Sequence, residues 1–203
     1  MDPHRPARRT LLSGGLLTAT ATALGAGSAA PAAARPRRPA DYPGAYWSPA
    51  SRSNYTVSRR PSAHRIDRVV VHVTQVTFAD TIRIFQNRSS RVSAHYVVRS
   101  RDGLVAQCVR EKDIGWHAGN WGHNTRSIGI EHEGWVDRPE WFTDALYLSS
   151  ALLTAYVCET YGIPRDRDHI IGHHEVPGAD HTDPGRYWDW ARYLRLVGSV
   201  RTI

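Results

Sequence analysis

The stretch "RIDRVVVHVTQ", residues 65–75, determines the fold that we expect for this chain. Its run of β-branched side chains is typical of a strand buried on both faces of a sheet, and consists of Val69, Val70, Val71 and Val73. His72 interrupts this run. A histidine in such a strand is either a core residue satisfied by hydrogen bonds or a metal ligand, and the strand alone leaves both open.

Strand and helix signals alternate along the rest of the domain. Further strands are predicted in "SAHYVVRSRDGLVAQCV" (93–109), as a pair joined by a turn at Asp102-Gly103, in "SIGIEHEGW" (127–135) and in "HIIGHHEV" (169–176). Helices are predicted over "TIRIFQN" (81–87) with Asp80 as N-cap, from Thr143 to Gly162, and over "YWDWARYLRLV" (187–197). This order predicts an α/β (α+β) single domain with a central mixed β-sheet flanked by helices.

Residues 1–34 have the composition of an export signal. Arg5, Arg8 and Arg9 precede a stretch rich in Leu, Gly, Ala and Thr, with small residues at the cleavage options. The pair Arg8-Arg9 fits the twin-arginine type, which predicts a secreted or cell-wall-associated protein. The stretch is too poor in strongly apolar residues for a spanning helix, so we expect no retained membrane anchor.

The segment that follows the signal is rich in Pro, Ser and Arg. This composition predicts a linker and N-terminal arm over 35–60, and we expect the folded domain over 61–203. The net charge of +7 gives little support to nucleic-acid binding, because residues 1–40 contribute five of the seven charges. We therefore expect no nucleic-acid partner. We also expect a monomer, although the sequence itself leaves the oligomeric state open.

The two cysteines, Cys108 and Cys158, allow two interpretations. In an exported chain a disulfide between them is chemically permitted. Alternatively both are small buried apolar residues, because Cys158 falls on the apolar stripe of the helix predicted after Thr143. The sequence leaves the pairing open.

A second cluster of candidate ligands lies in "GHHEVPGADHTDPG", residues 172–185. A catalytic metal site needs three protein ligands and one open position. His173 and His174 are consecutive, so on an extended chain they point to opposite faces and only one of them can be a ligand. Asp180 and Asp183 are equally suitable by chemistry alone. The pattern HExxH is absent, which excludes a helix-borne metalloprotease site.

Two other segments carry candidate site residues. Alternation in the strand at 127–135 puts Glu131 and Glu133 on one face, with Ile130 and His132 on the other. We expect Glu133 to be a solvated strand-end carboxylate. The segment "WHAGNWGHNTRS", 116–127, is too rich in Gly, Asn and His for regular structure, so we predict a binding loop. The alternative is a loop packed under its own aromatic side chains. His95 is expected in packing or lining a groove.

These motifs, in this order, resemble the zinc-dependent N-acetylmuramoyl-L-alanine amidases of type 2, which also include phage T7 lysozyme and the peptidoglycan recognition proteins. The resemblance begins at about residue 41 and rests on "VVVHVTQ", "SAHYVV", the Asp-Gly hairpin, "WHAGNW", "RSIGIEHEG" and "GHHEVPGADHTDPG". It implies that 61–203 is a zinc amidase catalytic domain with its zinc site at the open face of the sheet.

The resemblance also implies a role for each site residue. One Zn²⁺ per chain would be held by His72, His173 and Asp183, and Glu131 would take a proton from the attacking water. His181 stands where many members carry Lys, and with zinc it would stabilise the oxyanion. Trp116 and His117 would line the substrate groove.

The implied reaction is hydrolysis of the amide between the lactyl group of N-acetylmuramic acid and L-alanine, in peptidoglycan or a muropeptide. Two alternatives are a non-catalytic peptidoglycan-binding protein on the same fold and a zinc amidohydrolase or peptidase for another amide. The complete set of His72, His173, Asp183 and Glu131 favours an enzyme, because a pure binding protein needs no such set.

Overall fold

A computed structural model describes residues 39–201 of the chain. The predicted export signal, residues 1–34, lies outside the described residues. The described elements, with two 3₁₀ helices named η, are β1 (Ala45–Trp47), β2 (Tyr55–Thr56), β3 (Arg68–Val73), α1 (Phe78–Gln86), β4 (Tyr96–Val98), β5 (Val105–Gln107), β6 (Ile114–Gly115), α2 (Trp121–Arg126), β7 (Ser127–His132), η1 (Pro139–Trp141), α3 (Asp144–Tyr161), β8 (Ile170–Gly172), η2 (His173–Glu175) and α4 (Trp190–Ser199).

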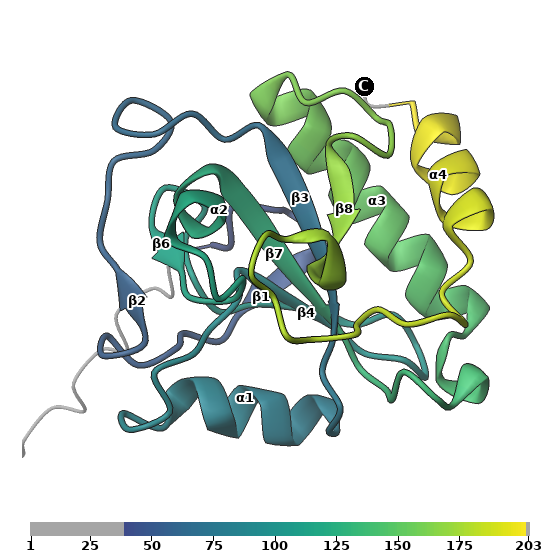
Figure 1. Ribbon diagram of the computed structural model, residues 1–203, viewed down its shortest axis with the longest axis horizontal. Helices are drawn as coiled ribbons and strands as arrows, with labels where there is room; N and C mark the ends of the chain where they lie inside the picture. Colours follow the sequence, from purple (N-terminus) through teal and green to yellow (C-terminus); the bar gives the residue numbers. More distant parts are fainter. Residues whose placement is uncertain (1–38, 202–203) are drawn as a thin grey trace, which may run out of the picture. The chain divides into compact units, whose positions relative to one another are not determined.

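The main sheet has the strand order β1-β5-β4-β7-β3-β8 (Figure 1). Only the hairpin pair β4 and β5 is antiparallel in it, and the other neighbours run parallel. Strand β3 lies between β7 and β8, and its Val69, Val70 and Val71 are fully buried. The predicted mixed sheet, built around a strand buried on both faces, is therefore confirmed.

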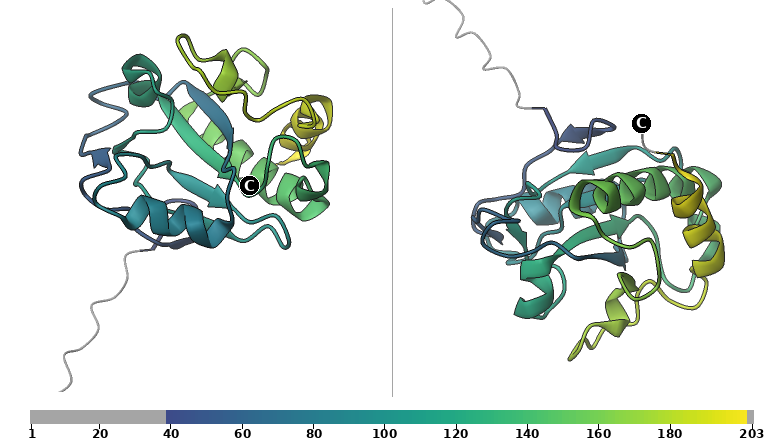
Figure 2. Two further views of the ribbon diagram at one scale, coloured as in Figure 1. Left: turned by 60° about the horizontal axis from the view of Figure 1, so that its bottom comes forward. Right: turned by 90° about the horizontal axis from the view of Figure 1, so that it is seen from above.

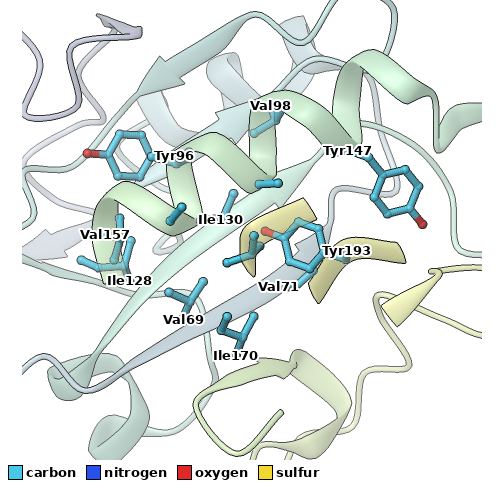
Figure 3. Packing of buried hydrophobic residues seen from close by; sticks show 14 of the residues in the cluster. Val69, Val71, Tyr96, Val98, Ile128, Ile130, Tyr147, Val157, Ile170 and Tyr193 are labelled. Carbon is cyan, nitrogen blue, oxygen red and sulfur yellow. The ribbon is translucent and has the colours of Figure 1, made fainter. Parts of the chain in front are cut away.

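Helices cover both faces of this sheet. Helices α3 and α4 lie together on one side, and α1 packs against β4 on the other (Figures 1 and 2). Alternate residues of β3 and β7 point to the α3 side, where Val69, Val71, Ile128 and Ile130 join the larger core (Figure 3). The intervening residues, His72 among them, point to the opposite face.

The long helix α3 begins and ends where its sequence predicts. The Thr143 side chain accepts a hydrogen bond from the Leu146 N–H, and Gly162 ends the helix with a φ of 65°. The predicted start of α1 is wrong, because the N-cap is Thr77 and not Asp80. Thr77 Oγ1 accepts from the Asp80 N–H, so Asp80 lies inside the first turn, where a carboxylate favours the helix dipole.

Two segments predicted as irregular contain regular structure. The predicted loop at 116–127 includes α2, which Asn120 caps by accepting from the His123 N–H. The segment predicted as linker and arm includes β1, which pairs with β5 at the edge of the sheet. Asp41 fixes this strand, because its carboxylate accepts from Gln107, Arg110 and the Glu111 N–H.

The two cysteines do not form a disulfide. Both are free and buried, Cys108 in the cluster beneath α1 and Cys158 in α3 on the opposite face of the sheet. The interpretation as small buried apolar residues is therefore correct. Within residues 39–201, no helix is both long enough and apolar enough to cross a membrane.

Candidate metal centre and substrate groove

The structure brings the three predicted ligands together. One nitrogen each of His72 and His173 and one carboxylate oxygen of Asp183 lie within 4.8 Å of one another, and all three residues are buried. Asp183 Oδ1 is 3.0 Å from His173 Nδ1, and Asp183 Oδ2 is 3.3 Å from His72 Nδ1. A single carboxylate thus faces both imidazole rings.

Parallel pairing explains why residues so distant in sequence meet. Strands β3 and β8 are neighbours in register, with Val71 opposite Gly172, so their carboxyl ends lie at the same edge of the sheet. His173 follows Gly172 directly and opens η2. The 3₁₀ turn leaves His174 exposed to solvent, so of the two consecutive histidines only His173 enters the site.

The loop after η2 places the two candidate aspartates differently: one is exposed to solvent and the other is buried. The Asp180 side chain is 95% exposed, whereas that of Asp183 is 7% exposed. Asp183 is also held from its backbone, because its carbonyl accepts the His174 N–H at 3.0 Å. The structure therefore places Asp183, and not Asp180, beside the histidines.

The charges of this cluster suit a divalent metal. Burial would raise the pKa of Asp183, but the neighbouring His173 and His72 rings lower that pKa well below its ordinary value. Burial lowers the pKa of His72, although Asp183 opposes the shift. An ionised carboxylate and a neutral imidazole are the protonation states that a metal requires.

The ligand set itself is of a known type. His173 Nε2 is buried without a hydrogen-bond partner, so this nitrogen is free to donate its lone pair to a metal. Two histidines and one carboxylate form a zinc-type ligand set.

Glu131 lies beside this cluster on the neighbouring strand. It is opposite His72 in the register of β7 and β3, and both residues line a cavity of about 310 Å³ with His173 and Asp183. Glu131 Oε2 has no hydrogen-bond partner. Burial, followed by the charge of Asp183, raises the pKa of Glu131 to about 8. A carboxyl group with such a pKa can both accept and return a proton near neutral pH.

A second cavity of about 630 Å³ adjoins the first, and Val92, His117, His173 and His181 line both. Trp116 lies in its wall, as predicted for a groove residue. Its Nε1 donates to Thr56 Oγ1 at 2.9 Å, and the Arg91 guanidinium lies 4.8 Å from its ring centroid. Trp121, from α2, also lines this cavity and is 57% exposed.

The two remaining predicted site histidines have different surroundings. His181 is at the rim, with a 62% exposed side chain and a ring stacked on that of His173 at 4.5 Å. His117 borders both cavities, but it is only 6% exposed and lies behind His72, with 2.9 Å between His117 Nδ1 and His72 Nε2. Burial lowers the pKa of His117 well below its ordinary value. Its contacts are therefore those of a residue behind the metal cluster more than those of a groove wall.

The expectation for Glu133 is wrong. Its carboxylate is buried, with Oε1 accepting from the Phe78 N–H and Oε2 from the Ser100 N–H, both at 2.8 Å. It thus joins the start of α1 to the β4–β5 hairpin. His95 is fully buried and its Nδ1 accepts from the Gly129 N–H, which agrees with the predicted role in packing.

The sequence did not identify Arg91 and Trp121 as groove residues. Arg91 lies in an irregular segment before β4 and has a positive φ of 55°, which no local pattern reveals. Trp121 belongs to the stretch 116–127, whose aromatic residues could have indicated that it lines the groove.

Comparisons with known proteins agree with this geometry. Residues 62–186 match the family described as N-acetylmuramoyl-L-alanine amidase. The chain is 37% identical over 176 residues to N-acetylmuramoyl-L-alanine amidase A of Achromobacter lyticus, a match that covers 77% of this chain and 95% of that protein. It is 32% identical over 166 residues to the 1,6-anhydro-N-acetylmuramyl-L-alanine amidase AmpD of Escherichia coli K12, covering 79% of each.

Solved structures share the fold. A crystal structure of a selenomethionine derivative of AmpD aligns with a TM-score of 0.64 and 30% identity, over 76% of this chain and 94% of that one. The complex of Escherichia coli AmiD with anhydro-N-acetylmuramic acid-L-Ala-D-γ-Glu-L-Lys aligns with a TM-score of 0.56 and 22% identity, over 68% and 60%. Together with the extent of the family match, these relatives show that the chain belongs to the N-acetylmuramoyl-L-alanine amidase family.

Proposed function

We propose that this chain is a zinc-dependent amidase that hydrolyses the bond between the lactyl group of N-acetylmuramic acid and L-alanine in peptidoglycan. The observation that carries the proposal is the unpartnered carboxyl oxygen of Glu131 in the same cavity as His72, His173 and Asp183. The names of the relatives from Achromobacter lyticus and Escherichia coli support this choice of amide.

His72, His173 and Asp183 would hold one zinc ion per chain. Bound zinc would lower the pKa of a water ligand to roughly 7 and polarise the substrate carbonyl. Glu131 accepts the proton of the attacking water on its carboxylate and returns it to the nitrogen of the leaving L-alanine. His181, at the rim, donates a hydrogen bond to the carbonyl oxygen as negative charge develops there. Loss of one such donor typically costs about 2.7–4 kcal/mol of transition-state stabilisation.

The larger cavity supplies the substrate groove of this proposal. Trp116 and Trp121 offer two aromatic surfaces, and Arg91 adds a cation that suits a carboxylate of the stem peptide. His117 contributes one buried edge to the groove and makes its closest polar contact with His72. A muropeptide that lies along this groove presents its amide to Glu131, because the two cavities adjoin.

We further propose that the protein is exported by the twin-arginine route and acts outside the cell or at the wall. The support for this is the sequence of residues 1–34, with Arg8-Arg9 before the apolar stretch. We also propose that the protein acts as a monomer without a retained membrane anchor.

Zinc analysis and product analysis on the full chain test the amidase proposal. We expect about one zinc per chain in wild type and in Glu131→Ala, with release of peptides that begin with L-alanine from purified peptidoglycan by wild type only. Glu140→Ala is the matched control, because it removes an exposed carboxylate that lines neither cavity and should keep both properties. Zinc and wall binding without release by wild type would instead identify a binding protein. New amino termini other than L-alanine would indicate a different amide.

A further inference from the structure

A chain of buried polar groups runs from the ligand His72 to the protein backbone. His72 Nε2 lies 2.9 Å from His117 Nδ1, and His117 Nε2 lies 3.2 Å from Ser127 Oγ. Ser127 Oγ in turn lies 2.6 Å from the carbonyl oxygen of His123. All members of this chain except that carbonyl belong to buried side chains.

The carbonyl at the end of the chain sets the direction of every hydrogen bond in it. A carbonyl oxygen only accepts, so the Ser127 hydroxyl must donate to His123 and can only accept from His117 Nε2. The proton of the neutral His117 ring is then on Nε2, and Nδ1 is left as an acceptor. His72 must therefore donate from Nε2, and its own Nδ1 carries the lone pair.

At the metal cluster, the lone pair of His72 Nδ1 faces the Asp183 carboxylate. His72 Nδ1 lies 3.3 Å from Asp183 Oδ2, so a ring lone pair and a carboxylate oxygen face each other. Two acceptors at this distance repel unless a cation lies between them. The hydrogen-bond chain thus prepares His72 to act as a ligand through Nδ1.

The backbone around His117 is shaped to hold its ring in this place. A Cβ atom on Gly129 of β7 would lie 2.5 Å from His117 Cγ, too close for any side chain larger than hydrogen. The ring meets that of His72 edge-on, with 5.0 Å between the centroids and an interplanar angle of 85°. The absence of a side chain at Gly129 therefore leaves the space that the His117 ring occupies.

We infer that His117 is a positioning residue of the metal centre, which accepts the Nε2 proton of His72 and so directs the Nδ1 lone pair of His72 toward Asp183. The inference rests on the proposed zinc site and adds a residue that acts on it from behind. Loss of such a partner of a ligating histidine typically weakens metal affinity by about 10–100-fold.

Zinc affinity of the full chain, measured by competition with a chelator, tests this inference. His117→Leu removes the acceptor, and Gly129→Ala forces the His117 ring out of its place, because the new Cβ would lie 2.5 Å from its Cγ. Both variants should bind zinc about 10–100-fold more weakly than wild type. His117→Asn keeps an acceptor oxygen near the place of Nδ1 and should recover most of the affinity. His64→Leu, at an exposed histidine away from the cluster, is the matched control and should bind like wild type.

A second readout separates positioning from folding. The visible spectrum of the cobalt-substituted protein should change in His117→Leu and stay close to that of wild type in His117→Asn. Circular dichroism of the metal-free variants checks that each is folded. Equal zinc affinity in His117→Leu and wild type would overturn the inference, and so would equal losses in His117→Leu and His117→Asn. Absence of zinc binding by wild type would overturn the proposed zinc site itself, and the inference with it.

Discussion

Glu131 shows how the position of one residue sets its chemistry. The strand register places its carboxyl group opposite His72, in a cavity where Oε2 has no hydrogen-bond partner. Burial and the nearby Asp183 carboxylate both disfavour the charged form, which raises the pKa of Glu131 to about 8 from an ordinary 4.5. In the metal-free protein the carboxyl group is therefore protonated at neutral pH.

This raised pKa predicts a pH-dependent stability of the metal-free protein. Between about pH 4.5 and 8 the folded state keeps a proton that the unfolded state releases, so Glu131 costs more stability as the pH rises through that window. Glu131→Gln removes the cost. We expect its free energy of unfolding to exceed that of wild type by only roughly 2 kcal/mol at pH 9, because solvent in the cavity weakens the penalty of the charged carboxylate. At pH 4.5 we expect little difference between the two proteins.

Urea unfolding with a chelator present, at both pH values, measures this difference. The control is Glu140→Gln, because Glu140 is exposed and outside the site. The same stability difference between Glu131→Gln and wild type at both pH values would show that the variant acts through packing and not through the proton.

The sequence predicted some ligand positions better than others. His72 was noticed because it interrupts a run of valines, and strand alternation placed Glu131 on one face together with Glu133. The roles of both His72 and Glu131 came from the family resemblance. Strand alternation could not choose between His173 and His174, since the chain leaves β8 and turns into η2 at that point. The choice of Asp183 over Asp180 came from the family resemblance. Their different burial depends on the loop conformation, which spacing does not encode.

At the level of elements, Glu133 connects three segments that the sequence treats as separate. It directly follows β7, accepts from the first N–H of α1, and accepts from the Ser100 N–H in the β4–β5 hairpin. A buried carboxylate that satisfies two buried donors stabilises both neighbours, and its removal leaves both donors unpaired.

We therefore predict that Glu133→Ala lowers the free energy of unfolding by about 3 kcal/mol. Glu133→Gln should lose less, because the amide oxygen can still accept from one of the two donors. Urea unfolding compares both with Glu140→Ala, which removes an exposed carboxylate on η1. If Glu133→Ala unfolds at the same urea concentration as Glu140→Ala, these two hydrogen bonds do not join the elements as we describe.

Prediction of elements succeeded where the local sequence alone determines them. Helix α3 has a Thr cap, an 18-residue body and a terminal glycine, so both of its ends could be located. Helix α2 could not, because Gly122, His123 and Asn124 are poor helix formers. Tertiary contacts hold it instead: Asn124 Oδ1 accepts the N–H groups of both His117 and Ala118.

At the scale of the whole domain, the two faces of the main sheet carry different residues: one packs the apolar core and the other carries the candidate site. The face toward α3 and α4 carries the larger apolar core (Figure 3). The other face carries His72 and Glu131, which line the smaller cavity. The mixed sheet could be predicted from the order of the elements, but strand β1 could not. It is three residues long, and its partner β5 lies about 60 residues further along the chain, so no local pattern identifies the pair.

Buried histidines make this architecture sensitive to acid. Burial lowers the pKa of His95 and His117 well below the ordinary value, and lowers that of His132 from 6.5 to about 3. The His132 ring packs on Trp188, with Nδ1 2.8 Å from the His72 carbonyl oxygen and Nε2 2.6 Å from Ser150 Oγ. The ring is therefore neutral in the folded protein, because burial disfavours the charged form.

The folded and unfolded chains differ in the proton that they bind at His132, and this difference makes the free energy of unfolding depend on pH. Below about pH 6.5 the unfolded chain binds a proton at His132 that the folded chain does not, so stability is lost as the pH falls from 6.5 toward 3. Each such histidine contributes a slope of about 1.4 kcal/mol per pH unit within its window.

His132→Gln should be less stable at pH 7, because the ring packing is lost, but its free energy of unfolding should fall less steeply with acid. Urea unfolding at pH 7, 6, 5 and 4 gives this slope, with His64→Gln as the exposed control. An unchanged slope in His132→Gln would place the acid sensitivity in other groups, and the buried His95 and His117 would then be the first to test.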